Sequence, residues 1–487
     1  VLECYLPLIE ILETSTKAKD ENPKVTISLS PTLLSLLSDN GLKKRFPNWL
    51  ETRLNLLKDI DKDKIEAACH LSKFISHQFS KWSEYKGDLI SRFSSLQNKK
   101  VIDILTCAAT HGYLPLLRET PEAVRAQLKT AIREHQRFFG VKPQGIWLPE
   151  CAYYEGLDKL MTECELRYSV LDSHGILHGI PRPRYGVYAP ICSKNGIAFF
   201  GRDSDATLPV WSAKEGYPGD LQYREFHRDI GWDLPLDKLN EIGIKTSRPL
   251  GLKLHKVSSA QVSLKDKNIY QPELALEKAK EHAKDYLINR RTQLNELTEE
   301  ITIDPILVAP FDAELFGHWW FEGPIFIAEI LKQSSIQGIE LTTLKEYLQN
   351  NSMIQLCNPS PSSWGKGGFH DYWLNESNSW VISEWSKASK EMVLRSSNGL
   401  SNKDSLRVLR QAARELLLSQ SSDWSFILRA GTTTELAKER IYRHLNRFWI
   451  LIKALDDDKS LSKVQLRSIE TEDCIFPLIH ANDWYKY

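Results

Sequence analysis

The sequence predicts a mixed α/β domain followed by an all-helical region. Between residues 101 and 172, short apolar runs alternate with segments of helical periodicity, a pattern typical of parallel βα units. Toward the C-terminal end the strand signals disappear and helical periodicity continues, at 380–397, 404–419 and 433–455. We therefore place one domain at 1–375 and an all-helical domain at 376–487, with no internal repeat.

Composition limits the classes of ligand. The chain has 487 residues, of which 42% are hydrophobic and 26% charged, as in an ordinary globular protein with more than one small core. Lys+Arg and Asp+Glu both number 63, so the formal net charge is zero. A nucleic-acid or anionic-membrane partner would require a basic excess, and neither is predicted. A neutral ligand fits this balance, and the sequence does not indicate an oligomeric state.

Cysteine spacing and the first residues bear on the compartment. The eight cysteines form no CxxC pair and have no histidine at zinc spacing, which predicts buried free thiols in a reducing, cytoplasmic compartment. No metal ion or cofactor is predicted, and no uninterrupted apolar run is long enough to span a membrane. The first residues lack a starting methionine and a basic segment and resemble the middle of a helix, so we expect that the natural beginning is missing.

The first hundred residues are predicted to be mainly helical. We expect a helix over 1–14, a strand and then a helix opened by Ser30 and Pro31, and two or three helices within 46–98. The βα units that follow begin with a strand at 101–107. After it we expect these elements: a helix from Pro121 to Phe139, a strand ending before Glu150, a helix over 156–166 and a strand over 168–172.

The alternation of strands and helices stops at 173–230, which we interpret as an inserted loop region. Short strands are predicted within it at 185–189 and 197–201. Arg224 and Arg228 are expected on one helical face, which is either functional or an ordinary solvated face. The elements predicted beyond this region are a helix over 272–299, a strand over 306–310, a helix over 325–333, a strand over 337–342 and a loop over 358–368.

Two segments of similar design carry the candidate chemistry. An apolar run, a proline, a carboxylate and aromatic residues occur around Glu150 in 145–154, and again around Asp312 in 306–320. Two carboxylates presented at strand ends, each beside aromatic surfaces the size of a sugar ring, suggest glycoside chemistry. His111 also lies just past a predicted strand end. The alternative is that both acids merely cap the helices that follow them, and this interpretation stays open.

Several segments resemble glycoside hydrolase family 57. Residues 147–153 (WLPECAY) are similar to its nucleophile motif, 311–320 (FDAELFGHWW) to its acid/base motif and 106–113 (TCAATHGY) to its substrate-binding motif. Residues 216–226 (GYPGDLQYREF) and 363–365 (SWG), with the helical C-terminal region, are similar to its branching-enzyme subgroup. The resemblance spans nearly the whole chain in order.

The resemblance implies an incomplete TIM-like barrel of seven strands and a helical C-terminal domain. It makes Glu150 the nucleophile and Asp312 the general acid/base of a retaining mechanism. Positions matching the family along the glucan are His111, Arg224, Gly251, Trp364 and Asp423. From their position in the second motif we add His318, Trp319 and Trp320 as candidate substrate contacts. The alternative for the two tryptophans is a core position at a domain interface. His318 could orient a carboxylate or simply satisfy a backbone carbonyl.

The implied activity is that of a 1,4-alpha-glucan branching enzyme, which would cut an alpha-1,4 bond and rejoin the segment through an alpha-1,6 bond. Alternatives are an amylase or a 4-alpha-glucanotransferase of the same family. The family opens with a strand carrying a His-X-Pro motif, and nothing before Glu150 matches it. If that strand is truly absent, a non-catalytic glucan-binding protein becomes the third alternative.

Two close carboxyl groups cannot both ionise easily, so one pKa is expected to be raised. Asp312, beside Phe311 and Phe316, is the predicted raised group, and Glu150 is expected to stay ionised. Glu314 and Glu155 lie within a turn of the two candidates, and the sequence does not exclude either of them as the working acid.

Overall fold

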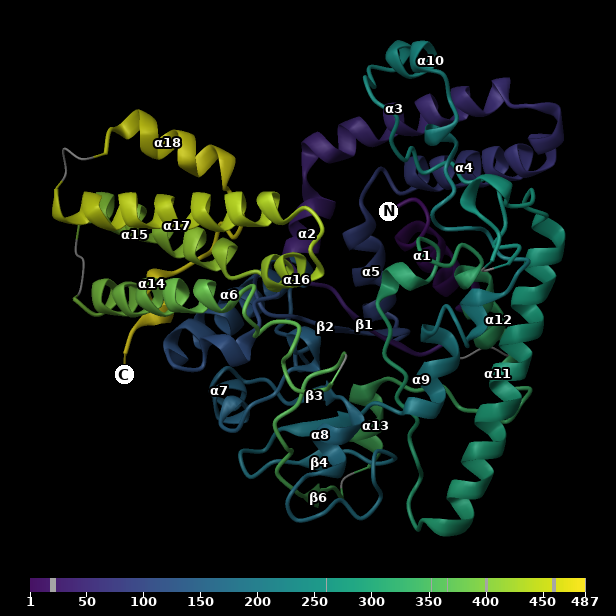
Figure 1. Ribbon diagram of the computed structural model, residues 1–487. Helices are drawn as coiled ribbons and strands as arrows, with labels where there is room; N and C mark the ends of the chain where they lie inside the picture. Colours follow the sequence, from purple (N-terminus) through teal and green to yellow (C-terminus); the bar gives the residue numbers. More distant parts are fainter. Residues whose placement is uncertain are drawn as a thin grey trace. The chain divides into compact units, whose positions relative to one another are not determined.

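The computed structural model describes residues 1–17, 23–259, 261–351, 353–365, 367–398, 402–457 and 461–486. The chain forms two compact units, and each is built from segments that are distant in sequence. Unit 1 contains 1–25, 37–103 and 204–347, and unit 2 contains 26–36, 104–203 and 348–487. Figure 1 shows the elements of both, which are described separately below.

Unit 2 contains a four-stranded sheet of order β3-β5-β4-β6. Its strands are β3 (Tyr168–Leu171), β4 (Ile191–Cys192), β5 (Ala198–Gly201) and β6 (Gln355–Leu356). β3 runs parallel to β5, β4 is antiparallel to β5, and β4 is parallel to β6. β3 and β5 are buried along their whole length, as expected for strands covered on both faces. The helices of this part are α6 (Pro121–Phe139), α7 (Leu157–Glu163) and α8 (Ser173–Leu177).

The strand-like segment before Glu150 extends this sheet. Gly145 bridges to Tyr168 of β3, and Ile146 bridges to Thr106, both in parallel. Thr106 directly follows β2 (Ile102–Leu105), which pairs with β1 (Val25–Ser28). The chain around residue 146 therefore lies between β2 and β3, and residues that follow it emerge at the carboxyl edge of the sheet, where clefts form in α/β proteins.

Helices α14 to α18 complete unit 2 (Figure 1). Their buried side chains belong to an apolar cluster that also includes residues of 108–199. They are α14 (Ser379–Ser397), α15 (Lys403–Ser419), α16 (Ser422–Ala430), α17 (Thr434–Asp456) and α18 (Lys463–Glu472). Local sequence signals mark the end of α16 and the start of α18. Gly431 ends α16 in the left-handed region at φ 74°, and Ser462 and Gln465 form a capping box at the start of α18. The cluster joins α14, α15 and α17 to α6, so these helices share one core.

Unit 1 is mainly helical. Its helices are α1 (Tyr5–Ser15), α3 (Asn40–Leu56), α4 (Ile65–Glu84), α5 (Leu89–Asn98), α9 (Ser204–Trp211), α10 (Leu236–Glu241), α11 (Pro272–Glu300) and α12 (Gly323–Gln333). α12 packs against both α1 and α11, as Figure 1 shows. Buried residues of α4, α11 and α12 share a core with the loops around Tyr223 and Leu252. Two further helices, α2 (Pro31–Ser38) and α13 (Leu344–Asn350), cross from one unit to the other.

The predicted mixed α/β architecture with a helical C-terminal region is confirmed. The helix that starts at Pro121 ends at Phe139, and the helix that starts at Gly323 ends at Gln333, both as predicted. A proline in the first turn marks the start of each helix. Four other predictions are wrong. Residues 185–189 and 337–342 form turns and irregular chain instead of strands, no strand is assigned to 306–310, and 223–228 is not helical. In each case the apolar or charged periodicity covers fewer than seven residues, too few for local pattern to decide the structure.

The domain boundary predicted near residue 375 stays a prediction, because the two units do not divide the chain into consecutive halves. All eight cysteines are free thiols, as predicted. Cys69 and Cys474 are exposed and Cys192 is half-buried, however, so the expectation that all are buried is wrong for these three. Among the described residues, no helix combines the length and apolar character required to cross a bilayer.

Candidate active site

Glu150 lies in unit 2, two residues after the strand-like segment that ends at Leu148. Pro149 starts a short 3-10 turn, in which Cys151 donates its backbone N–H to the carbonyl oxygen of Leu148 at 2.9 Å. Glu150 has φ 63° and Cys151 has φ 51°, so two successive side-chain-bearing residues adopt the left-handed region. This conformation is costly for such residues and tends to occur at functional sites.

Trp364 holds Glu150 through both backbone and side chain. Its backbone N–H donates to the carbonyl oxygen of Glu150 at 2.9 Å, and its indole Nε1–H donates to Oε2 at 2.6 Å. The segment containing Trp364 is fixed to this loop by Ser362, whose backbone exchanges two hydrogen bonds with Tyr153. Two segments that are distant in sequence are therefore joined at Glu150.

His111 and the start of α16 form the other wall around Glu150. His111 Nδ1 lies 2.8 Å from the hydroxyl oxygen of Ser422 and 3.8 Å from Oε1 of Glu150. Ser422 in turn donates its backbone N–H to the carbonyl oxygen of His111. Asp423, the next residue, is exposed and accepts a hydrogen bond from Ser421 at 3.0 Å. Three residues predicted from the sequence, His111, Trp364 and Asp423, thus lie around Glu150.

Burial controls the protonation of Glu150. Loss of solvent raises the pKa of this carboxyl group above its ordinary value, and the charge of Asp423 acts in the same direction. His111 and the Trp364 hydrogen bond favour the charged form but do not outweigh burial. The prediction that only Asp312 has a raised pKa is therefore wrong. For His111, burial acts against the charged form, but its interactions with Cys107, Glu150 and Asp423 outweigh burial and raise its pKa.

Three aromatic rings pack against the Trp364 side chain. Tyr113 and Trp373 are buried and stack with ring centroids 4.7 Å apart, and Trp364 packs against this pair. Trp147 meets the Trp364 ring edge-on at 5.1 Å. The half-buried indole of Trp364 is therefore fixed in place next to Glu150, and a fixed aromatic face beside a carboxylate suits an apolar sugar face.

Asp312 lies in unit 1 at the start of another 3-10 turn, Ala313–Leu315. Its side chain is half-buried, and its carbonyl oxygen accepts the backbone N–H of Leu315 at 3.1 Å. The chain then folds back, because His318 and Trp319 both donate their backbone N–H groups to the carbonyl oxygen of Glu314. The segment 312–319 is therefore a compact turn that presents Asp312, His318 and Trp319 together.

Glu3 is a residue of this region that the sequence reasoning missed. Its Oε1 accepts a 2.7 Å hydrogen bond from Arg224 Nη2, and its Oε2 lies 3.4 Å from His318 Nδ1. Arg224, a predicted substrate contact, is 95% buried, with its guanidinium group 3.7 Å from the ring centroid of Phe321. No spacing pattern identifies Glu3, because a lone acid before an apolar helix is common. Its partners are more than 200 residues away in the chain.

Comparison with known proteins places the chain in a family. The family model described as glycosyl hydrolase family 57 matches residues 2–242, and the model of the 1,4-alpha-glucan branching enzyme C-terminal region matches 384–484. The 1,4-alpha-glucan branching enzyme of Thermococcus kodakarensis is 32% identical over 93% of this chain and 69% of its own length. The chain belongs to glycosyl hydrolase family 57.

Two solved structures of similar sequence have the same fold as this chain. The alpha-amylase AmyC from Thermotoga maritima matches with a TM-score of 0.92 at 32% identity, covering all of this chain and 93% of that one. A GH57-type branching enzyme from Pyrococcus horikoshii matches with a TM-score of 0.90 at 31% identity, covering all of this chain and 91% of that one. The likeness therefore extends to proteins named for hydrolysis and to proteins named for branching.

Three further predicted residues of this family member occupy different environments. Trp320 is 1% exposed and packs among Tyr223 and Phe326, an environment that fits the core interpretation. Trp319 is 42% exposed and remains accessible. Gly251 has φ 78° and is exposed, and its backbone N–H donates to Asp229 at 2.8 Å. Asp229 thus fixes the loop that contains Gly251.

The two alternative acids differ from the candidates in their surroundings. Glu155 is exposed, although it lies only five residues after Glu150. Glu314 accepts a 2.6 Å hydrogen bond from the hydroxyl group of Tyr5, which fixes its carboxylate. The geometry favours Glu150 over Glu155 because only Glu150 is enclosed by hydrogen-bonding side chains in unit 2.

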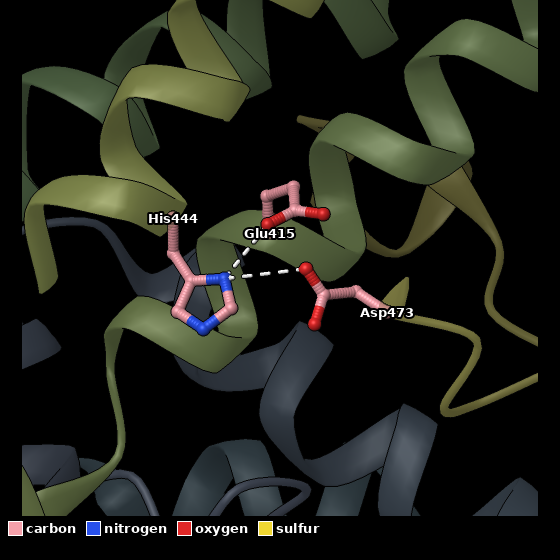
Figure 2. Close-up of side chains that lie close together, drawn as sticks. All are labelled: Glu415, His444 and Asp473. Atoms are coloured by element: carbon pink, nitrogen blue, oxygen red, sulfur yellow. Dashed lines mark hydrogen bonds and ion pairs between the residues drawn. The ribbon is translucent and has the colours of Figure 1, made fainter. Parts of the chain in front are cut away.

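Among the described residues, one group has its potential ligand atoms close enough to surround a metal ion, namely Glu415, His444 and Asp473 in Figure 2. Glu415 Oε2 lies 2.7 Å from His444 Nδ1, a hydrogen-bond distance, and Asp473 also pairs with Arg447. Because these lone pairs already have protein partners, the arrangement fits an ion-pair network that joins α15, α17 and the segment after α18. It does not require a metal ion.

Proposed function

We propose that this chain is a 1,4-alpha-glucan branching enzyme. The observation that carries the proposal is the enclosed Glu150 carboxyl group, held by Trp364 and flanked by His111, in a chain 32% identical to a branching enzyme over 93% of its length. The substrate is an alpha-glucan such as amylose, amylopectin or glycogen. A neutral polysaccharide also fits the zero formal net charge.

In the proposed retaining mechanism, two carboxyl groups act on one glycosidic bond. The carboxylate of Glu150 attacks the anomeric carbon, the bond to the leaving sugar oxygen breaks, and a covalent glucosyl–enzyme forms. Asp312 protonates the departing oxygen. It then removes the proton from the 6-hydroxyl group of an acceptor glucan, whose oxygen displaces Glu150 and creates the alpha-1,6 branch. Transfer to water instead would be hydrolysis.

The other predicted residues receive supporting roles in this proposal. Trp364, His111 and Asp423 contact the sugar bound at Glu150, and His318 and Trp319 contact it from the Asp312 turn. In unit 1, the buried side chains of Arg224 and Trp320 hold the Asp312 turn in place, and Gly251, in the loop that Asp229 supports, contacts the glucan. We also propose that the fold is a seven-stranded incomplete barrel and that the enzyme works in the cytoplasm, without a metal ion or cofactor.

Hydrolysis is the second candidate because an alpha-amylase has a TM-score of 0.92 against this chain. The two activities share the covalent intermediate and differ in whether a sugar hydroxyl group or water attacks it. Branching therefore requires water to be kept away from the intermediate while an acceptor chain is bound.

The test is incubation of the purified protein with amylose. Branching lowers iodine staining and creates isoamylase-sensitive points while adding few reducing ends. Hydrolysis raises the number of reducing ends in parallel with the loss of staining. A 4-alpha-glucanotransferase redistributes chain lengths without isoamylase-sensitive points. A non-catalytic glucan-binding protein leaves the polymer unchanged but is retarded in a gel that contains glucan. Only the first outcome supports the proposal.

A further inference from the structure

Glu3 connects two residues that are otherwise separate. One oxygen of its carboxylate accepts the 2.7 Å hydrogen bond from Arg224, and the other faces His318 at 3.4 Å. Its side chain is 14% exposed, whereas the His318 side chain is 49% exposed. A half-exposed histidine on a turn has many accessible rotamers, so a buried, fixed carboxylate next to its ring restricts its orientation.

Arg224 provides the rigid side of this arrangement. Its backbone N–H donates to Glu322, a fully buried carboxyl group that also accepts a 2.5 Å hydrogen bond from Tyr270. Its guanidinium group packs on Phe321. Glu3 is therefore held on one side by a residue that cannot move easily, and its second oxygen is directed at His318.

The chain around Glu3 is also fastened to the turn that contains Asp312. Tyr5 donates its hydroxyl proton to Glu314 at 2.6 Å, and the Sγ of Cys4 lies 3.9 Å from the carbonyl oxygen of Glu314. Gly317 has φ 115°, and a Cβ added to it would lie 1.7 Å from the carbonyl oxygen of Glu3. This close approach allows only glycine at position 317 and fixes the distance between the two segments.

We propose that Glu3 is a positioning residue of the transfer reaction, which acts by orienting His318 beside Asp312 with Arg224 as its anchor. The inference rests on the proposed function, because it assigns a role within the same reaction. Glu3 does not touch the reacting atoms in this scheme. Its loss should lower kcat more than it changes KM, since the His318 side chain is still there to contact the glucan but no longer has the orientation that the transition state requires.

The experiment compares Glu3→Gln with Glu3→Asp and with a matched control, Glu13→Gln. Glu13 is on the same N-terminal segment, is 15% exposed and pairs with Arg92 and Tyr85, away from the Asp312 turn. We expect Glu3→Gln to lower kcat on amylose about tenfold, with KM changed less than about twofold. Glu3→Asp should restore part of the rate because it keeps the charge, and Glu13→Gln should keep the wild-type rate.

A double variant tests whether Glu3 acts through His318. If it does, adding Glu3→Gln to His318→Gln lowers kcat by less than about twofold further, because the group that Glu3 orients is already gone. If the two losses multiply, or if Glu13→Gln lowers kcat as much as Glu3→Gln, Glu3 has only a structural role and the inference fails.

Hydrogen exchange measured by mass spectrometry tests whether Glu3 orders the turn that contains His318, and it requires no measurement of activity. Peptides covering 313–320 should exchange faster in Glu3→Gln and unchanged in Glu13→Gln. Unchanged exchange in Glu3→Gln overturns the inference. An inactive or purely hydrolytic wild-type protein would instead overturn the proposed function, and the exchange result would still stand.

Discussion

The indole Nε1–H of Trp364 donates a 2.6 Å hydrogen bond to Oε2 of Glu150, although the two residues are 214 positions apart. The backbone N–H of Trp364 also bonds to the carbonyl oxygen of Glu150. Together these bonds fix the carboxyl group from a second segment of unit 2. The indole bond favours the ionised carboxylate and so opposes the effect of burial on its pKa.

The first prediction removes this hydrogen bond. Trp364→Phe keeps an aromatic face but loses the donor, so we expect kcat to fall about 10–100-fold, the value of one hydrogen bond to a charged group. Initial rates on amylose measure the effect. Trp380→Phe is the control, because Trp380 is also half-buried in unit 2 but stacks on Tyr442, away from Glu150. A Trp364→Phe rate equal to that of the control would contradict the role of the bond.

The second prediction separates the roles of the two carboxyl groups. Glu150→Ala and Asp312→Ala should each lower kcat by about 10²–10⁴-fold or more. With an activated glucoside and azide, azide replaces the missing group. Glu150→Ala should then yield a glucosyl azide of inverted configuration, and Asp312→Ala one of retained configuration, as identified by NMR. Glu155→Gln is the exposed control and should keep its rate. Azide products of the opposite configurations would exchange the two assignments.

The sequence predicted the elements and residues that depend on local pattern. Helix α6 has a proline in its first turn and a left-handed glycine, Gly140, after its end, and both signals are readable from the chain. Glu150 was placed at the end of a buried run because apolar residues followed by proline and an acid give that signal. The similarity of whole motifs then brought His111, Trp364 and Asp423 into one site.

The rest depends on contacts that no local pattern contains. Arg224 and Arg228 have helical spacing, but the chain between them is irregular. The backbone N–H of Arg224 donates to the carboxylate of Glu322, and that of Glu225 donates to the carbonyl oxygen of His255. Glu3 gains its role from Arg224 and His318, which are 221 and 315 positions away. The raised pKa of Glu150 follows from burial, which a sequence does not display.

The third prediction concerns the loop that contains Gly251. Asp229 is 1% exposed and accepts four backbone N–H groups, from Gly231, Leu250, Gly251 and Leu252. Asp229→Asn places an amide NH₂ group, which cannot accept a hydrogen bond, against two of these donors. The free energy of unfolding should therefore fall by about 3 kcal/mol. Urea denaturation followed by circular dichroism measures this loss.

The control for that measurement is Asp233→Asn. Asp233 has a 39% exposed side chain and pairs with Arg228 at the surface, so the expected change is below about 0.5 kcal/mol. Equal losses for Asp229→Asn and Asp233→Asn would mean that the four backbone hydrogen bonds contribute nothing specific to stability.

The fourth prediction follows from the raised pKa of Glu150. Between the carboxyl pKa of the unfolded chain, about 4.3, and the higher folded value, the native protein binds more protons than the unfolded chain. The stability contributed by this group is therefore complete below the unfolded pKa and is lost as pH rises through the folded pKa.

The variant Glu150→Gln stays neutral and keeps an oxygen that accepts a hydrogen bond from Trp364, so its melting temperature should be higher than that of the wild-type protein at neutral pH. Melting curves between about pH 4 and pH 7 should show this difference shrinking as pH falls. With the exposed Glu155→Gln as control, a Glu150→Gln variant that melts below the wild-type protein at neutral pH would show that burial does not disfavour the Glu150 charge.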